Sequence, residues 1–360
     1  MPTSCAVAPS VEPSSHSVAT PVYFDHDGGS DDFVALVYLL KHQHRFNLLG
    51  VTVTAANSWW KVGTSATRKI LRIFSGTNVC ASDGGRVPVP VAESTLPAVN
   101  PFPNAWRYDS CKVNLLPQLN PDPLALTGDA HPAVGGGGEE NNVGVSGQLL
   151  LAQTLMAASS PVTLIATGPL SNLAWVLDNF PEACSKIDRV LIMGGAIDVP
   201  GNASAKHTDE IIDETAEWNF FWDPPAAKRV WDSDLTLVLT PLDATNDAPV
   251  TKDMLLRIGQ HHHSASSTLV GTIWALAGGH FMETGEAFFA FDLLTVAQLV
   301  HPELFTTEEV ECDIVSEGVS QGRVVRTGAG HDSRGGRSVT VVRARDAGEM
   351  FDVIFAELCS

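Results

Sequence analysis

Four carboxylates fall within eight residues near the start of the chain, in the segment Asp25-His26-Asp27-Gly28-Gly29-Ser30-Asp31-Asp32. Like charges this close repel one another by about 1 kcal/mol per pair at ~4 Å in water, and by more at a lower dielectric. A helix N-terminus would offset only about 0.3–1 kcal/mol per acid. A bound cation is the simplest way to hold the acids together, and all-oxygen ligands favour calcium or magnesium.

The residues on either side of this acidic segment predict the elements that position it. The apolar run at 21–24 indicates a strand, and a helical pattern of apolar residues covers 33–40. The acids therefore lie at the carboxyl end of a strand, just before a helix. Open α/β sheets bind their ligands at this edge.

Apolar runs of four to eight residues alternate with helical patterns along most of the chain, which is typical of βαβ units. Strands are expected at 46–54, 78–81, 162–166, 190–193 and 235–239, and near the C-terminus at 310–315, 322–326 and 339–342. Helices are expected at 59–74, 148–158, 171–179, 224–231, 264–283, 292–300 and 347–359. We expect one α/β domain over residues 21–360, with a central, mostly parallel, Rossmann-like sheet flanked by helices and extra strands near the C-terminus.

Composition narrows the possible partners and the cellular setting. The 360 residues include 22 basic and 41 acidic ones, for a formal charge of −19, which disfavours nucleic acid and anionic membranes as partners. No apolar run approaches the ~18–20 residues of a membrane span. Six scattered cysteines without a CxxC pair indicate reduced thiols inside a cell. Residues 1–20 are interpreted as a disordered tail without a secretory signal, and a cytoplasmic location is expected. The Gly-rich stretch 127–147 is interpreted as a surface loop insertion.

Other polar residues suited to a site recur at or after the predicted strand ends. They are Asn57, Thr167, Asn202, Glu217, Asn219 and, at the start of a late helix, Asp292. If the sheet is parallel, several of these side chains should meet the acidic segment at one edge.

The motifs together resemble those of the nucleoside hydrolase family. The similarity rests on Asp25-His26-Asp27-Gly28 with Asp31-Asp32, then Thr167-Gly168-Pro169-Leu170-Ser171-Asn172, then Thr215-Ala216-Glu217-Trp218-Asn219, in this order. Asn100-Pro101-Phe102-Pro103 with Trp106, and Trp222-Asp223-Pro224, resemble the inosine-adenosine-guanosine-preferring branch of trypanosomatids. The resemblance runs from about residue 22 to the C-terminus.

This resemblance implies calcium-dependent hydrolysis of the N-glycosidic bond of purine ribonucleosides in purine salvage. One calcium ion per subunit would be held by Asp27, Asp32, Asp292 and the backbone carbonyl of Thr167, with Asp27 also the general base on a metal-bound water. The transition state would be oxocarbenium-like. The remaining substrate contacts would come from Asp31, Asn57, Asn202, Glu217 and Asn219, with Asp292 shared and with Trp106 and Phe291 at the base. Inosine, guanosine and adenosine are the expected substrates, and a homodimer is the expected assembly.

The sequence departs from the purine branch at three of these positions. Phe291 stands where that branch has a Trp, and it also does not match the His that another branch uses as general acid. Gly29 replaces an Asn that would reach the substrate, and Asn57 replaces an Asp. Activation of the leaving base is therefore the step that the resemblance supports least.

Two alternatives remain open at the level of sequence. A haloacid-dehalogenase-type phosphatase has a similar Asp-x-Asp-Gly loop, but Thr or Val usually follows that Gly, and Asp31-Asp32 comes too early for its late acidic pair. A nucleoside-binding protein that has lost turnover would retain the metal and ribose ligands. The changes at Gly29 and Phe291 keep this second alternative open.

Overall fold

A computed structural model describes residues 19–360 except 75–87, 121–143, 262, 285–286 and 329–334. The strand expected at 78–81, residues 1–18 of the expected tail and most of the 127–147 loop lie outside the described residues. No helix in the described part of the chain is long and apolar enough to cross a membrane.

The described strands form one mixed sheet of nine, in the order β3-β2-β1-β4-β5-β6-β9-β7-β8. These strands are β3 (Val91–Glu93), β2 (Phe46–Val53), β1 (Thr20–His26), β4 (Val162–Ala166), β5 (Ile187–Met193), β6 (Leu237–Thr240), β9 (Arg337–Ala344), β7 (Phe305–Ile314) and β8 (Val324–Arg326). All pairs from β3 to β9 are parallel, whereas β7 pairs antiparallel with both β9 and β8.

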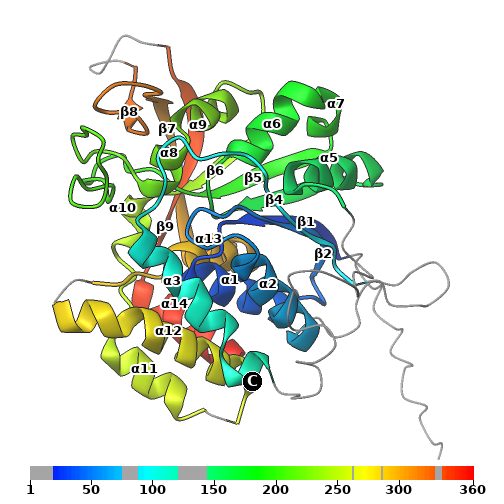
Figure 1. Cartoon of the computed structure of the whole chain (residues 1–360), viewed down its shortest axis with the longest axis vertical. Helices are drawn as coiled ribbons and strands as arrows, with labels where there is room; N and C mark the ends of the chain where they lie inside the picture. The colour runs from blue at the N-terminus through cyan, green and yellow to red at the C-terminus, as the bar shows by residue number, and fades with distance from the viewer. Residues whose placement is uncertain (1–18, 75–87, 121–143, 262, 285–286, 329–334) are drawn as a thin grey trace, which may run out of the picture.

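Helices cover both faces of the sheet (Figure 1). One layer holds α1 (Ser30–Lys41), α2 (Val62–Phe74), α3 (Asn104–Asn114), α11 (Lys252–Gly259), α12 (Ala265–Thr284), α13 (Phe291–Val300) and α14 (Ala347–Cys359). The other holds α5 (Gly147–Ala157), α6 (Ser171–Asn179), α7 (Pro181–Cys184) and α9 (Pro224–Trp231). The short segments are α8 (Trp218–Trp222), α10 (Leu242–Thr245), η1 (Pro117–Leu119) and η2 (Pro302–Leu304).

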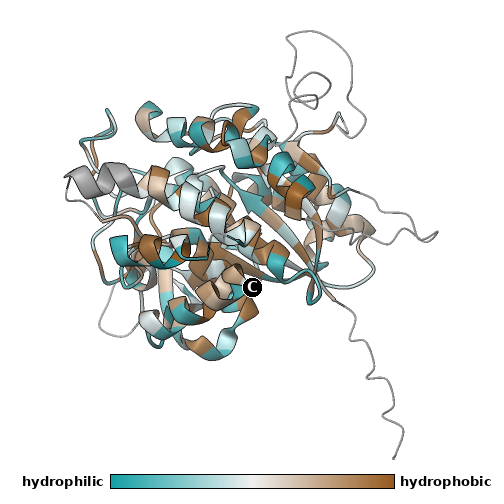
Figure 2. Ribbon diagram, turned by 90° about the horizontal axis from the view of Figure 1, so that it is seen from below, coloured by the Kyte–Doolittle hydropathy of each residue, from teal (hydrophilic) through white to brown (hydrophobic). Residues whose placement is uncertain are grey.

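Two hydrophobic cores, one on each face, fix these layers. All five residues of β4 are buried, as expected for a central parallel strand that reads as a continuous apolar run. Alternate side chains serve opposite cores: Phe24 packs with α1, α12 and α13, whereas Tyr23 packs with α5 and α6. The helices in Figure 2 carry hydrophilic and hydrophobic residues in alternation, which suits helices with one face on the sheet.

The expected fold class is confirmed, and element ends are where sequence and structure differ. The helix expected at 59–74 begins at Val62, because Lys61 has a left-handed φ of 65° that α-helix does not allow. The strand expected at 235–239 is β6, Leu237–Thr240. Of the C-terminal strands, β9 runs parallel to β6, whereas β7 and β8 run antiparallel to their neighbours and form one edge of the sheet.

Candidate active site

A tight turn after β1 carries the acidic segment into α1. Gly28 has φ +80°, and a Cβ built on it would lie 2.5 Å from Oγ of Ser58, so both conformation and space require glycine here. The Ser58 hydroxyl donates to the backbone carbonyl of Asp27 at 2.8 Å. A Cβ on Gly168, at the end of β4, would lie 2.8 Å from Cβ of Asp27. The ends of β1 and β4 therefore meet closely.

Asp32 anchors the acidic turn through both of its carboxylate oxygens. Its Oδ2 accepts from the backbone N–H groups of Gly29 (2.8 Å) and Asp27 (3.3 Å), and its Oδ1 accepts from the hydroxyl of Thr167 (2.6 Å). Burial opposes its ionisation, but the His26 ring, whose Nδ1 lies 3.7 Å away, and the hydroxyl of Thr167 hold the pKa of Asp32 below its ordinary value. Asp32 is thus a fixed carboxylate at the base of the site.

Asp27, Asp31 and Asp292 complete a buried group of four carboxylates. Burial, followed by the charges of the neighbouring acids, raises the pKa of Asp27 and of Asp292 well above the ordinary range. The same two causes raise the pKa of Asp31 to about 7. Four buried acids this close cannot all ionise easily without a neutralising positive charge. Their carboxylate oxygens are the hard ligands that calcium takes, so the group fits a calcium-type cation.

The segment before and within α8 faces the same edge of the sheet. Glu217 is buried, and its carboxylate accepts from the backbone N–H groups of Gly195 (3.0 Å) and Asn219 (2.9 Å). Burial raises the pKa of Glu217 to about 7 although these bonds oppose the shift. The amide of Asn219 donates to the backbone carbonyls of Thr167 and Met193, each at 3.2 Å. The carbonyl of Thr167 that was predicted to bind metal therefore points toward this segment.

Asn202 and Asn57 lie at the border of this site. The Asn202 side chain accepts from the backbone N–H of Trp218 at 2.9 Å, so it also holds the start of α8. The Oδ1 atom of Asn57 is buried without a hydrogen-bond partner among the described residues. A Cβ built on Gly29 would lie 2.8 Å from Nδ2 of Asn57 and 3.1 Å from Oδ1 of Asp31. The Asn57 side chain thus occupies the space that a side chain at position 29 would need.

Trp106 and Phe291 belong to two separate aromatic groups. The Trp106 ring, half-buried on α3, lies 5.3 Å from the ring of Trp218 and 4.8 Å from that of His207. The ring of Phe291, at the start of α13 beside Asp292, lies 5.8 Å from that of Phe289 and packs against a small cluster that includes Met193 at the end of β5. Trp106 approaches the site from α3 and Phe291 from α13, so the two aromatic groups come from different elements.

The structure therefore brings the predicted acids and Thr167 together and places the predicted amides around them. Sequence reasoning gave no role to Asn172, although it lies in a quoted motif. Its amide donates to Oδ1 of Asp25 and to the hydroxyl of Thr54, each at 2.9 Å. Arg107, also missed, donates to the carbonyls of Ala55 (3.2 Å) and Ser58 (3.0 Å) and so fixes the loop after β2. Arg107 directly follows Trp106 and binds on either side of Asn57, so these two predicted residues were the signal in the sequence that could have pointed to it.

Comparison with known proteins identifies the family. The family model described as inosine-uridine preferring nucleoside hydrolase matches residues 22–352. Pyrimidine-specific ribonucleoside hydrolase RihA of Escherichia coli is 31% identical over 316 residues, covering 86% of this chain and 88% of the relative. RihA of Citrobacter koseri is 29% identical over 320 residues, with the same coverage.

Solved structures of nucleoside hydrolases resemble the fold of this chain. The inosine-uridine preferring nucleoside hydrolase of Bacillus anthracis superposes with a TM-score of 0.78 at 31% identity, covering 94% of this chain and 99% of the other. The purine-preferring ribonucleoside hydrolase of Gardnerella vaginalis shares the fold, with a TM-score of 0.70 at 19% identity and coverages of 94% and 98%.

The chain belongs to the inosine-uridine preferring nucleoside hydrolase family. It is accordingly a ribonucleoside hydrolase, an enzyme that cleaves N-glycosidic bonds, and this supports the hydrolase over the phosphatase and the inactive binding protein. The resemblance to the family is confirmed. The resemblance to the trypanosomatid purine branch finds no counterpart in these relatives, whose names include pyrimidine-specific enzymes.

Proposed function

We propose that this enzyme is a calcium-dependent purine ribonucleoside hydrolase that releases the free base and ribose. The observation that carries the proposal is the group of four buried carboxylates beside Glu217 and Asn219, with the Trp106 ring nearby. The acids suit a hard cation and a polyhydroxylated sugar, and the indole suits a flat base. Inosine, guanosine and adenosine are the proposed substrates.

In this proposal Asp27, Asp32, Asp292 and the Thr167 carbonyl hold the ion. When bound, calcium orients the ribose hydroxyls and lowers the pKa of a water. Asp27 is the general base that removes a proton from the attacking water, because its carboxylate belongs to the acid cluster and is held by one bond from the backbone N–H of Gly29 (3.3 Å). The water oxygen bonds to the anomeric carbon as the C–N bond breaks, and the leaving base takes a proton from solvent.

The remaining buried polar groups hold the ribose. Asp31, Asn202, Glu217 and Asn219 supply acceptors and donors for its hydroxyls, and Asn57 has an unpaired buried oxygen that a ligand N–H or O–H could satisfy. A site built this way rejects analogues that lack a hydroxyl, because its own polar groups would be left unpaired. We expect 2′-deoxyinosine to be a much poorer substrate than inosine.

One experiment tests the reaction and the role of Asp27 together. Free hypoxanthine and ribose are measured from inosine for the wild type, for Asp27→Asn, and for Asp253→Asn as an exposed control on α11. A general base contributes about 10²–10⁴-fold to the rate. The rate of inosine hydrolysis by Asp27→Asn should therefore fall by about 10²-fold or more, while the control keeps full activity. Unchanged activity in Asp27→Asn would contradict its role as base.

Pyrimidine ribonucleosides are the second candidate substrates, because two of the relatives named above are pyrimidine-specific. Measuring kcat/KM for inosine, guanosine, adenosine, uridine and cytidine under one set of conditions separates the two. A higher value for uridine or cytidine than for every purine nucleoside would overturn the purine preference and leave the hydrolase itself intact.

The metal, the assembly and the location complete the proposal. Activity after removal of metal with a chelator should return with calcium and less well with magnesium, since the acids can offer more than the six oxygens that magnesium takes. A homodimer in the cytoplasm is proposed from the family resemblance and from the free thiols of the four cysteines that the structure describes. Light scattering of the purified chain tests the dimer.

A further inference from the structure

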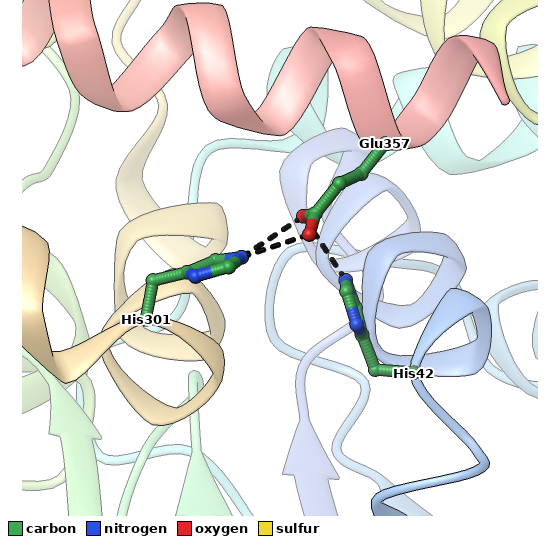
Figure 3. A group of neighbouring side chains, drawn as sticks. All are labelled: His42, His301 and Glu357. Atoms are coloured by element: carbon green, nitrogen blue, oxygen red, sulfur yellow. Dashed lines mark hydrogen bonds and ion pairs between the residues drawn. The ribbon is translucent and has the colours of Figure 1, made fainter. Parts of the chain in front are cut away.

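A second cluster of metal-type side chains lies at the other end of the helices that carry the acidic site. His42, His301 and Glu357 point toward one another from α1, α13 and α14 (Figure 3). Nε2 of His42 lies 3.2 Å from the Glu357 carboxylate, and Nε2 of His301 lies 2.9 Å from it. One ligand atom from each of the three residues lies within 4.8 Å of the others.

The hydrogen-bond pattern of His301 leaves too few protons for the acceptors around it. Its Nδ1 lies 2.9 Å from the carboxylate of Glu303, while its Nε2 faces Glu357 at 2.9 Å. A neutral imidazole has one N–H and can donate to only one of the two carboxylates. A positive charge on or beside the ring satisfies both. In metal sites, a histidine that binds the ion through one ring nitrogen is commonly oriented by a carboxylate at the other nitrogen, as Glu303 lies at Nδ1 here.

The surroundings favour a cation at this point. His42 directly follows α1 and His301 directly follows α13, and Glu357 lies in the last turn of α14. The C-termini of three helices therefore converge, each with partial negative charge. Nε2 of His42 is buried and makes no hydrogen bond in the described part of the chain. Tyr38 donates its hydroxyl to Glu357 at 2.5 Å and so fixes the carboxylate.

We propose that His42, His301 and Glu357 form a binding site for a divalent transition-metal ion of the zinc class. Two imidazoles and one carboxylate are a ligand set that zinc takes, with water in the fourth position, whereas calcium prefers oxygen ligands alone. In tetrahedral zinc sites with bonds of about 2.0–2.2 Å, ligand atoms lie about 3.3 Å apart. The two separations from Glu357, 2.9 and 3.2 Å, would open slightly in such a site, and the ligand atoms of the two histidines lie within 4.8 Å of each other. The charged groups nearby are Glu303 and Arg45, with the His44 ring 5.9 Å from that of His42.

The position of this site suggests what it does. The same two helices begin at the acidic site, α1 with Asp31 and Asp32 and α13 with Asp292. With 12 residues, α1 is about 18 Å long, so the two metal sites lie at opposite ends of one helix pair. A metal bound to both C-terminal ends, and to α14, would hold the helices in one relative position. The site is thus a structural clamp behind the catalytic edge.

The test is a cobalt(II) titration of the full-length enzyme in excess calcium, which occupies the all-oxygen site. Cobalt replaces zinc in such sites and reports ligand geometry by visible absorption. We expect one cobalt per chain with an intense tetrahedral spectrum, displaced by one zinc. Thermal unfolding should shift upward when zinc is added in excess calcium. Absence of a tetrahedral cobalt signal, or of a zinc-dependent shift, would overturn the proposal whatever the variants show.

Variants then assign the ligands. His42→Asn and His301→Asn should each weaken cobalt binding by 100-fold or more, and the exposed His261→Asn is the matched control that should not change it. Glu303→Gln alters a side chain that is 66% exposed and should fold normally. It should weaken binding about tenfold by removing the outer carboxylate. Binding of unchanged strength in His301→Asn would overturn the assignment.

Discussion

Glu217 offers the sharpest test of how burial sets the chemistry of this site. Its side chain is 2% exposed and accepts from the backbone N–H groups of Gly195, Asn219 and Phe220. Burial raises its pKa from the ordinary 4.5 to about 7. In the unfolded chain Glu217 ionises near 4.5, so between these two pH values the folded protein holds a proton that the unfolded chain has released.

The sign of the effect on stability follows from linkage. Because folding raises the pKa of this carboxyl, its contribution to the stability of the folded state is fully present below the unfolded-state pKa of 4.5. That contribution is lost as the pH rises from 4.5 through about 7. Each tenfold change in proton affinity corresponds to about 1.4 kcal/mol. For a pKa of about 7 against 4.5, the loss amounts to about 3 kcal/mol in the free energy of unfolding.

Glu217→Gln removes this titration and keeps the shape of the side chain. The amide loses one acceptor, which costs a constant amount at every pH, so only the pH-dependent part reports the raised pKa. Urea unfolding without nucleoside and with chelator, at about pH 5 and about pH 8, measures both proteins, with Glu182→Gln controlling for the exchange at an exposed position. Part of the loss has already occurred at pH 5, so the wild type should lose about 2.5 kcal/mol relative to the variant between the two pH values. A constant difference would refute the reasoning, and an increase would reverse its sign.

Three further predictions concern neighbouring groups. Asn172→Ala leaves Asp25 and Thr54 without their buried donor and should lower the free energy of unfolding by about 1–3 kcal/mol in urea titrations, whereas the exposed Asn179→Ala should change it little. Trp106→Ala should lower kcat/KM for inosine about 10- to 100-fold, from a stacking contribution of about 1–3 kcal/mol; an unchanged value would remove Trp106 from base recognition. Trp274→Ala, in the core beneath α14, should cost about 3–5 kcal/mol by calorimetry with kcat unchanged at low temperature, and a smaller loss would mean that the core repacks.

The parts of the site that follow the chain locally were predictable from sequence. The strand, the Gly-rich turn and the helix that hold Asp27 and Asp32 are contiguous, so hydrophobic period and turn residues indicate all three. The parallel sheet then brings Thr167 at the end of β4 to the same edge, because parallel strands share that edge. Local pattern and one topological rule were therefore sufficient for this half of the site.

Contacts that depend on the space between segments distant in sequence could not be predicted from the sequence. Gly29 and Asn57 each looked like an isolated departure from the purine branch. In the structure Asn57 fills the space beside Gly29, so the two departures belong together. The cluster of His42, His301 and Glu357 was missed for a similar reason. Its members are far apart in sequence, and no short spacing marks them as ligands.

The two sides of the site differ in how firmly the protein holds them. On the side proposed to hold the ribose, the acids and Glu217 are buried, and Asp32 and Glu217 accept from backbone N–H groups at the sheet edge, so they cannot move without disturbing the fold. On the side proposed to hold the base, Trp106 is half-buried and contacts other aromatic rings, which can shift or be exchanged at lower cost. Relatives named for pyrimidine, inosine-uridine and purine preference match this chain by sequence or by fold. If the proposed roles hold, exchanges among the aromatic groups around Trp106 and Phe291 should change the base preference more readily than exchanges among the buried acids.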